Sequence, residues 1–302
     1  MAKARAIVKR RKAVRNIRKI TKTMQMIATA MFQKSLKRAV ATKPYTRKVR
    51  ELVAELAASL GGSIDHPLLR QPDEASRTNK IALVVITSNR GLAGAYNGSV
   101  LRAATAFIRQ QEAAGKTVEL YLAGKKGISY FNYQKRPAKV KYDQFGDMPK
   151  FDDVERAAGH FIEEFTTGKV DAVYVAYMNF ISAGSQKPDV TQLLPLSAAD
   201  VAKPQAAGAG PALKVVTQYD FYPSARELLD ELLPQTVKAA MFQAFLDATT
   251  SENVARMIAM KSATDNADKM VKALTMEYNR ARQSQITTEL SEIMGGVEAM
   301  KG

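Results

Sequence analysis

The chain has 302 residues, with 45 Lys and Arg against 29 Asp and Glu, and its formal net charge is +16. It contains no Cys, which excludes disulfides and thiolate metal sites, and its two His lie far apart, at His66 and His160. This composition argues against a zinc site and a histidine-based catalytic triad. No stretch reaches 18 uninterrupted apolar residues, so the sequence predicts no membrane-spanning helix.

The positive charge is concentrated in the first 50 residues. They hold 17 Lys and Arg and no Asp or Glu before Glu51, so the remaining residues carry a net charge of −1. Such a segment favours a partner of opposite charge, either nucleic acid or an acidic protein. A transit peptide is disfavoured because such peptides are rich in Ser, and the first Ser is Ser35.

Residues 1–60 predict one long helix, because they lack Gly and contain a single Pro, Pro44. Its Lys and Arg nearly encircle the helix between residues 9 and 22, whereas a base-reading helix usually has one basic face. A 3-4-3-4 spacing of larger apolar residues predicts a coiled-coil seam at Ile17, Ile20, Met24, Ile27 and Met31. Residues 61–79, which begin with Gly61-Gly62, predict a linker.

Residues 80–222 predict a doubly wound, Rossmann-like α/β domain. Apolar strands are expected at 81–88, 118–124, near Val140, at 170–180, 190–196 and 213–219, with a loop insertion at 203–212. Helices are expected from the loop at 88–97 to about Gly115, from Lys125, and from about Asp152 to Thr167.

Residues 223–302 predict a second long helix, which Pro234 should kink or restart. Its 3-4 alternation runs through Met260, Ala263, Ala267, Met270, Leu274 and Ala281, and a phase slip then gives Ile286, Leu290, Ile293, Val297 and Met300. Two long helices at opposite ends of a chain can bury their seams against each other. We therefore expect an α/β fold plus a long antiparallel coiled coil, in which the terminal helices form a shaft and the α/β domain its base.

The sequence predicts no catalytic, cofactor or metal site. The loop SNRGLAGAYN (88–97) joins a strand to a helix and could hold a phosphate, but it lacks the GxGxxG and GK[ST] patterns and suits a tight turn better. The adjacent carboxylates Asp152-Asp153 and Glu163-Glu164 point in different directions on a helix, so we expect solvated charges rather than an acid/base pair.

Four stretches resemble the gamma subunit of F-type ATP synthase, in order along the whole chain. They are RKAVRNI with KITKTMQMIATA (19–30), ITSNRGLAGAYN (86–97), YDFYPSARELLDELLP (219–234) and the C-terminal run from Arg256 to Gly296. The chain departs from the family pattern at Asn89, Ala93, Ala95 and Val297.

The resemblance implies a non-catalytic rotor subunit without a cofactor, present once in each complex. The shaft would turn inside a hexamer of alternating alpha and beta subunits, and the base would rest with the epsilon subunit on the membrane c-ring. The complex would lie at the cytoplasmic face of a bacterial inner membrane, with this chain a peripheral member. Residues implied to contact the hexamer are Lys19, Lys22, Met24, Arg256, Gln283, Thr287 and Glu289, and the shaft seam would include Ile17, Ile20, Ile27, Met31, Met270 and Leu274.

Two other functions stay open from the residues alone. One is a nucleic-acid-binding coiled-coil protein, whose affinity would fall steeply as salt rises. The other is a small-molecule α/β enzyme that uses the loop at 88–97.

Overall fold

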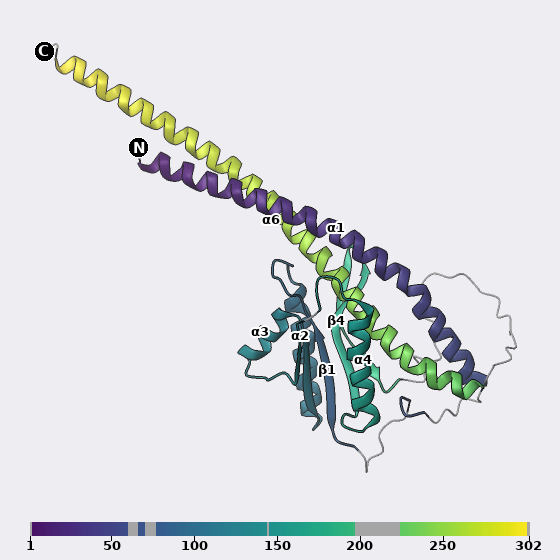
Figure 1. Cartoon of the computed structure of the whole chain (residues 1–302). Coiled ribbons are helices and arrows are strands. Elements are labelled where there is room, and N and C mark those ends of the chain that lie inside the picture. The colour runs from purple at the N-terminus through teal and green to yellow at the C-terminus, as the bar shows by residue number, and fades with distance from the viewer. Residues whose placement is uncertain (1, 60–65, 70–76, 144, 197–223, 301–302) are drawn as a thin grey trace. The chain divides into compact units, whose positions relative to one another are not determined.

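The computed structural model describes residues 2–59, 66–69, 77–143, 145–196 and 224–300 (Figure 1). The chain forms two compact units: residues 31–255 make one, and residues 1–30 with 256–302 make the other. Helices α1 (Ala2–Ser59) and α6 (Ala225–Ala299) each contribute to both units. The predicted shaft helices and the predicted strand-rich centre are therefore both present.

The unit of residues 31–255 is built on a mixed five-stranded sheet with the order β3-β2-β1-β4-β5. Strands β1 to β4 are parallel, and β5 pairs with β4 in the antiparallel sense. The strands are β1 (Lys80–Ile86), β2 (Thr117–Ala123), β3 (Val140–Tyr142), β4 (Ala172–Ser182) and β5 (Ser185–Leu194).

Helices cover both faces of this sheet. Helices α2 (Tyr96–Ala113) and α3 (Lys125–Tyr133) pack on one face, and α4 (Phe151–Thr166) packs on the other with parts of α1 and α6 (Figure 1). Strand β1 is central and covered on both sides, which explains why six consecutive residues, 81–86, are buried. The chain reverses its winding direction between β1 and β4, as in other doubly wound folds.

The observed elements confirm the predicted strands at 81–88, 118–124, near Val140 and at 170–180, and the predicted helices between them. Strand β5 differs from its prediction, because it begins at Ser185 rather than 190 and forms a hairpin with β4. The strand expected at 213–219 and the insertion at 203–212 lie outside the described residues.

Helix α6 does not restart at Pro234, which lies inside it. A proline in a helix removes one backbone hydrogen bond and costs about 3 kcal/mol. The burial of Leu229, Leu233 and Val237 around it supplies packing that offsets this loss.

One expected surface charge, Glu164, is instead buried under the sheet and only 4% exposed. It accepts a hydrogen bond from the Tyr121 hydroxyl and one from Lys139 Nζ at 2.6 Å. Burial acts to raise the pKa of Glu164, but the hydrogen bonds from Lys139 and Tyr121 outweigh it and lower the pKa. Adjacent residues on a helix point about 100° apart, so one of the pair at 163–164 can face the core while the other faces solvent.

A second buried carboxylate, Asp247, lies in the part of α6 that packs on the sheet. It is 6% exposed and accepts a hydrogen bond from Gln243 Nε2 at 3.0 Å. Burial raises its pKa to about 6, although the charge of Lys43 and the bond from Gln243 both favour the ionised form. Ionised Asp247 therefore destabilises the folded chain.

The turn after β2 requires glycine. At Gly124 φ is +95°, and a Cβ there would lie 2.1 Å from the backbone oxygen of Thr87. Gly159 in α4 is the opposite case, because a Cβ there would meet no atom within 4 Å.

We expect Gly124→Ala to destabilise the chain by about 3 kcal/mol or more, since it adds a backbone clash to an unfavourable φ. Gly159→Ala should stabilise it by roughly 0.5–1 kcal/mol, because Ala favours a helix interior. Urea unfolding of the two variants beside the wild type measures both changes. Equal effects of the two substitutions would show that the approach of Gly124 to Thr87 is absent.

We expect Asp247→Asn to stabilise the chain by about 1–3 kcal/mol at pH 8 and to have little effect near pH 4. The folded pKa is above the unfolded value of ~3.9, so wild-type stability falls as pH rises from about 4 through about 6. The amide keeps an acceptor for Gln243 without the charge. Urea unfolding at several pH values tests this, with Glu164→Gln as a control that should lose stability at pH 8. If the stability difference between Asp247→Asn and the wild type does not change with pH, the raised pKa of Asp247 is contradicted.

Candidate functional site

The candidate functional surface belongs to the unit that contains residues 1–30 and 256–302, where α1 and α6 pack as a pair. The buried side chains between them are mostly small or short: Ile7, Thr21, Ala28, Met260, Thr264 and Ala267. Small side chains allow two helix backbones to approach closely. The pair is thus held by a narrow seam rather than by large apolar side chains.

The seam follows a heptad rhythm on both helices. Buried or half-buried positions recur at 7, 11, 14, 21, 25 and 28 on α1 and at 260, 264, 267, 271, 274, 278, 281 and 285 on α6. On α6 the intervals alternate between four and three residues, which keeps one stripe facing α1. On α1 the same spacing holds except between 14 and 21, where the intermediate position is the exposed Arg18.

Three polar contacts fix the antiparallel register of the pair. Thr264 Oγ1 donates to Thr21 Oγ1 at 2.9 Å, and both side chains are buried. The next contact toward the N-terminus is an ion pair of Arg18 with Asp268. Beyond it, the Arg11 guanidinium lies 5.0 Å from the centre of the Tyr278 ring, a cation–π contact.

On α1 the observed seam differs in phase from the predicted one, whereas on α6 the predicted positions 260, 267, 274 and 281 lie on the observed seam. Ile17, Ile20 and Ile27 are 53%, 59% and 55% exposed, and Met270 is 54% exposed. Leu274 and Met31 are half-buried, and Met31 belongs to the other unit. The physical reason is that the two helices approach through their small residues, so the larger ones are displaced to the outer surface.

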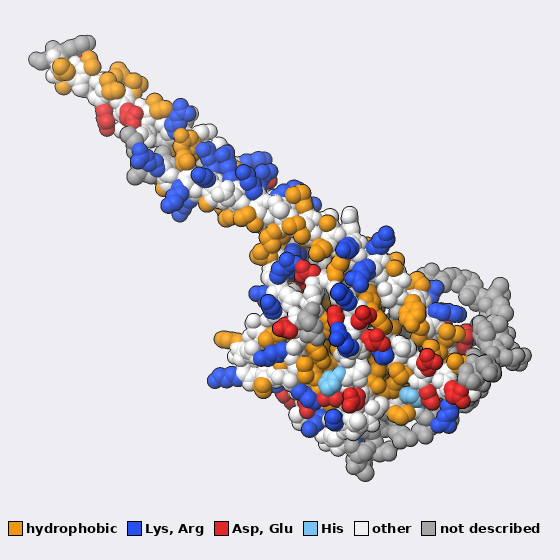
Figure 2. Space-filling view, in the orientation of Figure 1, with side chains coloured by type: hydrophobic (Ala, Val, Ile, Leu, Met, Phe, Trp, Pro, Cys, Tyr) orange, Lys and Arg blue, Asp and Glu red, His pale blue; other side chains and the backbone are white. Residues whose placement is uncertain are grey.

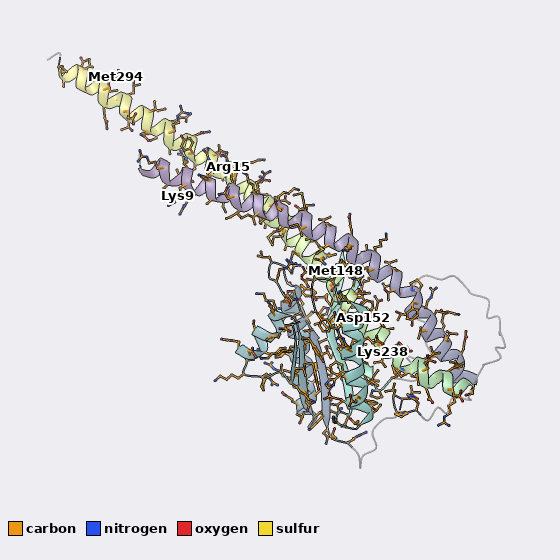
Figure 3. The ribbon with its side chains drawn as sticks, viewed as in Figure 1. Lys9, Arg15, Met148, Asp152, Lys238 and Met294 are labelled. Carbon is orange, nitrogen blue, oxygen red and sulfur yellow. The ribbon has the colours of Figure 1, made fainter. Side chains whose placement is uncertain are left out.

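Cations cover the outside of α1 in this unit. Among the described residues of α1 before Met31, Arg18 makes the only ion pair. Arg11 contacts Tyr278 within the seam, and the other described cations up to Lys22 are exposed. Lys9 and Arg15 are two of them (Figure 3), and Figure 2 shows Lys and Arg side chains gathered along the paired helices. This surface attracts an acidic partner.

The end of α6 carries an exposed apolar stripe. Its large side chains are between 48% and 65% exposed at Ile286, Leu290, Ile293, Met294 and Val297. The labelled Met294 lies on this stretch (Figure 3), which extends past the residues that pair with α1. Exposed apolar stripes on a helix mark a surface that a partner covers.

The residues that the family resemblance implies as partner contacts are mostly on the outside. Lys19, Lys22, Gln283, Thr287 and Glu289 are exposed, and Met24 is half-buried. The exception is Arg256, which is only 7% exposed. The structure buries Arg256 within the chain, so this side chain is not presented on a free surface.

The loop at 88–97 in the other unit uses its polar groups internally. Asn97 accepts from the Ser88 backbone N–H at 3.0 Å, and Ser88 Oγ donates to the Arg90 carbonyl at 2.6 Å. Asn89 Nδ2 donates to the Phe145 carbonyl at 2.8 Å, and Arg90 pairs with Asp147. These bonds tie the loop to neighbouring segments, as the turn interpretation expects.

The edge where β1 and β2 end is filled by protein. A cavity there measures about 30 Å³ and is lined partly by α6, at Phe245, Ala248, Thr249 and Glu252. Ligand pockets usually measure 300 Å³ or more, so a nucleotide does not fit.

The described residues contain no group of three or more His, Asp or Glu that could hold a metal. Among the helices that the structure describes, none has the length and apolar composition needed to cross a membrane.

Sequence reasoning missed the residues that hold the pair together: Thr21, Thr264 and Asp268. The available signal was the heptad of small and polar residues that runs beside the heptad of Ile and Met. The predicted seam of α1 contains only the larger apolar residues, whereas the observed one runs through Thr21 and Ala28.

Comparisons with known proteins agree across the whole chain. A family model described as ATP synthase matches residues 3–300. The ATP synthase gamma chain of Rhodopirellula baltica is 43% identical over 302 residues, covering 100% of both chains.

Two solved structures share the fold. A chain of the Euglena gracilis mitochondrial ATP synthase, in a structure of OSCP/F1/c-ring, has a TM-score of 0.65 at 20% identity and covers 99% of this chain and 95% of its own. A chain from the rotor of the same organism's enzyme has a TM-score of 0.60 at 18% identity, covering 94% and 99%.

We expect Ala28→Leu to destabilise the helix pair by about 1–3 kcal/mol, because the larger side chain overpacks a narrow seam. Ile27→Ala should change stability by less than about 0.5 kcal/mol, because Ile27 is exposed. Hydrogen exchange of the α6 amides between residues 264 and 281 measures both effects. If Ile27→Ala destabilised the pair more than Ala28→Leu, the seam would instead be the one of larger residues that the sequence predicts.

Proposed function

We propose a function from one established premise: this chain belongs to the ATP synthase gamma chain family. We infer that it is the central rotor subunit of an F-type ATP synthase. Its rotation couples ion flow through a membrane c-ring to ATP synthesis or hydrolysis at a hexamer of alpha and beta subunits. The rotor and c-ring named for the solved structures of like fold support this proposal.

The single observation that carries the proposal is the paired stretch of α1 and α6. It is stiffened by its seam and by three polar contacts that fix its register. A rotor must keep its two helices from sliding past each other when torque acts on them. A seam of short side chains meets that need, because little rotamer freedom is left between the helices.

The outer surface of the pair suits a hexamer with acidic groups toward its centre. The cations of α1, including Lys19 and Lys22, would meet those groups, and Met24 would lie at the same contact. The exposed stripe at the end of α6, with Gln283, Thr287 and Glu289 beside it, would turn against apolar residues of the hexamer. The cations of α1 and the acidic groups of the hexamer would attract each other at long range. The apolar stripe of α6 would form no hydrogen bond or ion pair that rotation has to break.

The α/β part would form the base, next to the epsilon subunit and the c-ring. In this division residues 1–60 and 223–302 are the shaft helices, 61–79 are a linker and 80–222 are the base. The subunit would occur once per complex and would associate peripherally with the cytoplasmic face of a bacterial inner membrane.

We infer that the chain is not itself catalytic and that the chemistry takes place on alpha and beta. The polar groups of the loop at 88–97 bond to neighbouring backbone and side chains, and the adjacent cavity of about 30 Å³ is too small for a nucleotide. Nucleic acid is a weaker candidate for the basic surface, because the cations surround α1 rather than forming one face.

Reconstitution tests the proposal. We expect the purified chain to show no ATPase activity alone and to assemble with alpha and beta into a hexamer that hydrolyses ATP and rotates. Lys19→Glu with Lys22→Glu should weaken assembly roughly ten-fold at low salt, and less at high salt, because the contact is electrostatic.

The matched control for this pair of substitutions is Lys116→Glu, an exposed lysine between α2 and β2. Copurification from native membranes should also recover alpha, beta and epsilon in fixed proportion. ATP turnover by the isolated chain, or equal assembly of the double variant and the control, would contradict the proposal.

A further inference from the structure

Among the contacts that join α1 and α6 to the rest of the unit of residues 31–255 are four that form two pairs, each pair with one contact for each helix. Two of them involve the far end of strand β4, and two involve the start of helix α4. We call the first two the β4 contacts: Phe32 with Phe180, and Ser251 with Met178. We call the other two the α4 contacts: Arg38 with Pro149, and Lys238 with Glu155.

The β4 contacts hold both helices through residues that lie two apart on one strand. The rings of Phe32 on α1 and Phe180 on β4 have centres 6.2 Å apart, and Phe180 is 9% exposed. Ser251 on α6 is fully buried, and its hydroxyl donates to the Met178 carbonyl at 3.3 Å. One short piece of β4 thus contacts α1 with a side chain and α6 with a backbone oxygen.

The α4 contacts repeat this arrangement at a second level. Arg38 donates to the Pro149 carbonyl at 3.3 Å. Lys238, which is labelled in Figure 3, pairs with Glu155 at 2.9 Å. The rings of Phe151 and Phe242 add an edge contact with centres 5.3 Å apart. Ser251 and Lys238 are separated by about 20 Å along α6 at 1.5 Å per residue, so α6 is held at two well-separated levels.

The β4 contacts are the ones nearest to where the helices leave this unit. The unit ends at Met31 on α1 and at Ala255 on α6, so Phe32 and Ser251 lie within four residues of its limits. A torque applied to the sheet can turn each helix about its own axis unless a side contact opposes it. The contacts near the point where each helix continues determine how stiffly the turn is passed on; on α6 they also include the packing of Ala255 against the core.

We propose that Phe180 and Ser251 are positioning residues that couple rotation of the α/β sheet to the two helices. This inference rests on the proposed rotor function. Phe180 blocks rotation of α1 by contact of two rings, and Ser251 blocks rotation of α6 by a hydrogen bond in a fully buried position. The α4 contacts oppose tilting of the same helices, because they act at the second level.

The test uses the complex assembled from this chain with alpha and beta subunits. With the hexamer held in one catalytic state, the angular fluctuation of a probe fixed to the α/β unit reports the torsional stiffness. We expect Phe180→Ala combined with Ser251→Ala to raise the variance of this angle at least two-fold. ATP hydrolysis should change less than two-fold, because the hexamer acts on the helix pair itself.

Phe131→Ala is the matched control. Phe131 is fully buried in the core under α2 and α3. Its removal should lower the thermal midpoint at least as much as the double variant does, yet leave the angular variance at the wild-type value. Phe180→Leu should restore most of the stiffness, because it replaces the lost bulk against Phe32.

Hydrogen exchange of the isolated chain supplies a readout that does not depend on rotation. Amides of residues 32–38 should exchange about ten-fold faster in the double variant and normally in Phe131→Ala. If the double variant shows the same angular variance and the same exchange rates as the wild type, the inference is overturned. If the wild-type complex does not rotate but the exchange rates still differ, the rotor function is wrong, while the contacts of Phe180 and Ser251 with the helices are supported.

Discussion

The close approach of α1 and α6 between residues 7–28 and 260–281 limits which side chains can lie between them. Most of the buried positions hold short side chains, at Thr21, Ala28, Thr264 and Ala267, and Ile7 and Met260 are the two exceptions. Thr264 donates a hydrogen bond to Thr21, and Thr21 donates one to the Arg18 carbonyl, as buried hydroxyls require. Every other feature of the pair follows from this narrow seam.

Because the seam is made mostly of short side chains, most of the larger apolar side chains and cations of the pair face outward, with Ile7, Met260 and Arg11 as exceptions. The outer surface therefore combines exposed Ile and Met with a dense positive field, a combination that is unfavourable for an isolated helix pair in water. A surrounding partner that is both acidic and apolar removes this cost. The packing of the pair and its need for an enclosing partner thus have one physical origin.

The α/β unit has the topology that binds ligands in many proteins, but α6 covers the edge where such ligands enter. Phe145 packs against Phe245 there, with ring centres 4.5 Å apart. Phe145, Phe245 and the Ser251 hydrogen bond attach α6 to the α/β unit, and Phe180 attaches α1 through its contact with Phe32.

The sequence was sufficient wherever one segment decides its own structure. The apolar run 81–86 predicted a strand covered on both faces, and the Gly-free termini predicted long helices, because these patterns are local. The hairpin start of β5 at Ser185 was missed, since its polar residues 185–189 pair on an edge rather than in the core. The burial of Glu164 was missed because its partners Tyr121 and Lys139 come from distant segments.

The sequence by itself determined the helix lengths, the strand order along the chain and the position of the charge. Only the tertiary structure decided which stripe of each helix is the seam. Two stripes with the same 3-4 spacing run along α1, one through Ile17, Ile20 and Ile27 and the other through Thr21 and Ala28. Periodicity cannot choose between them, because the choice depends on how closely the partner helix approaches.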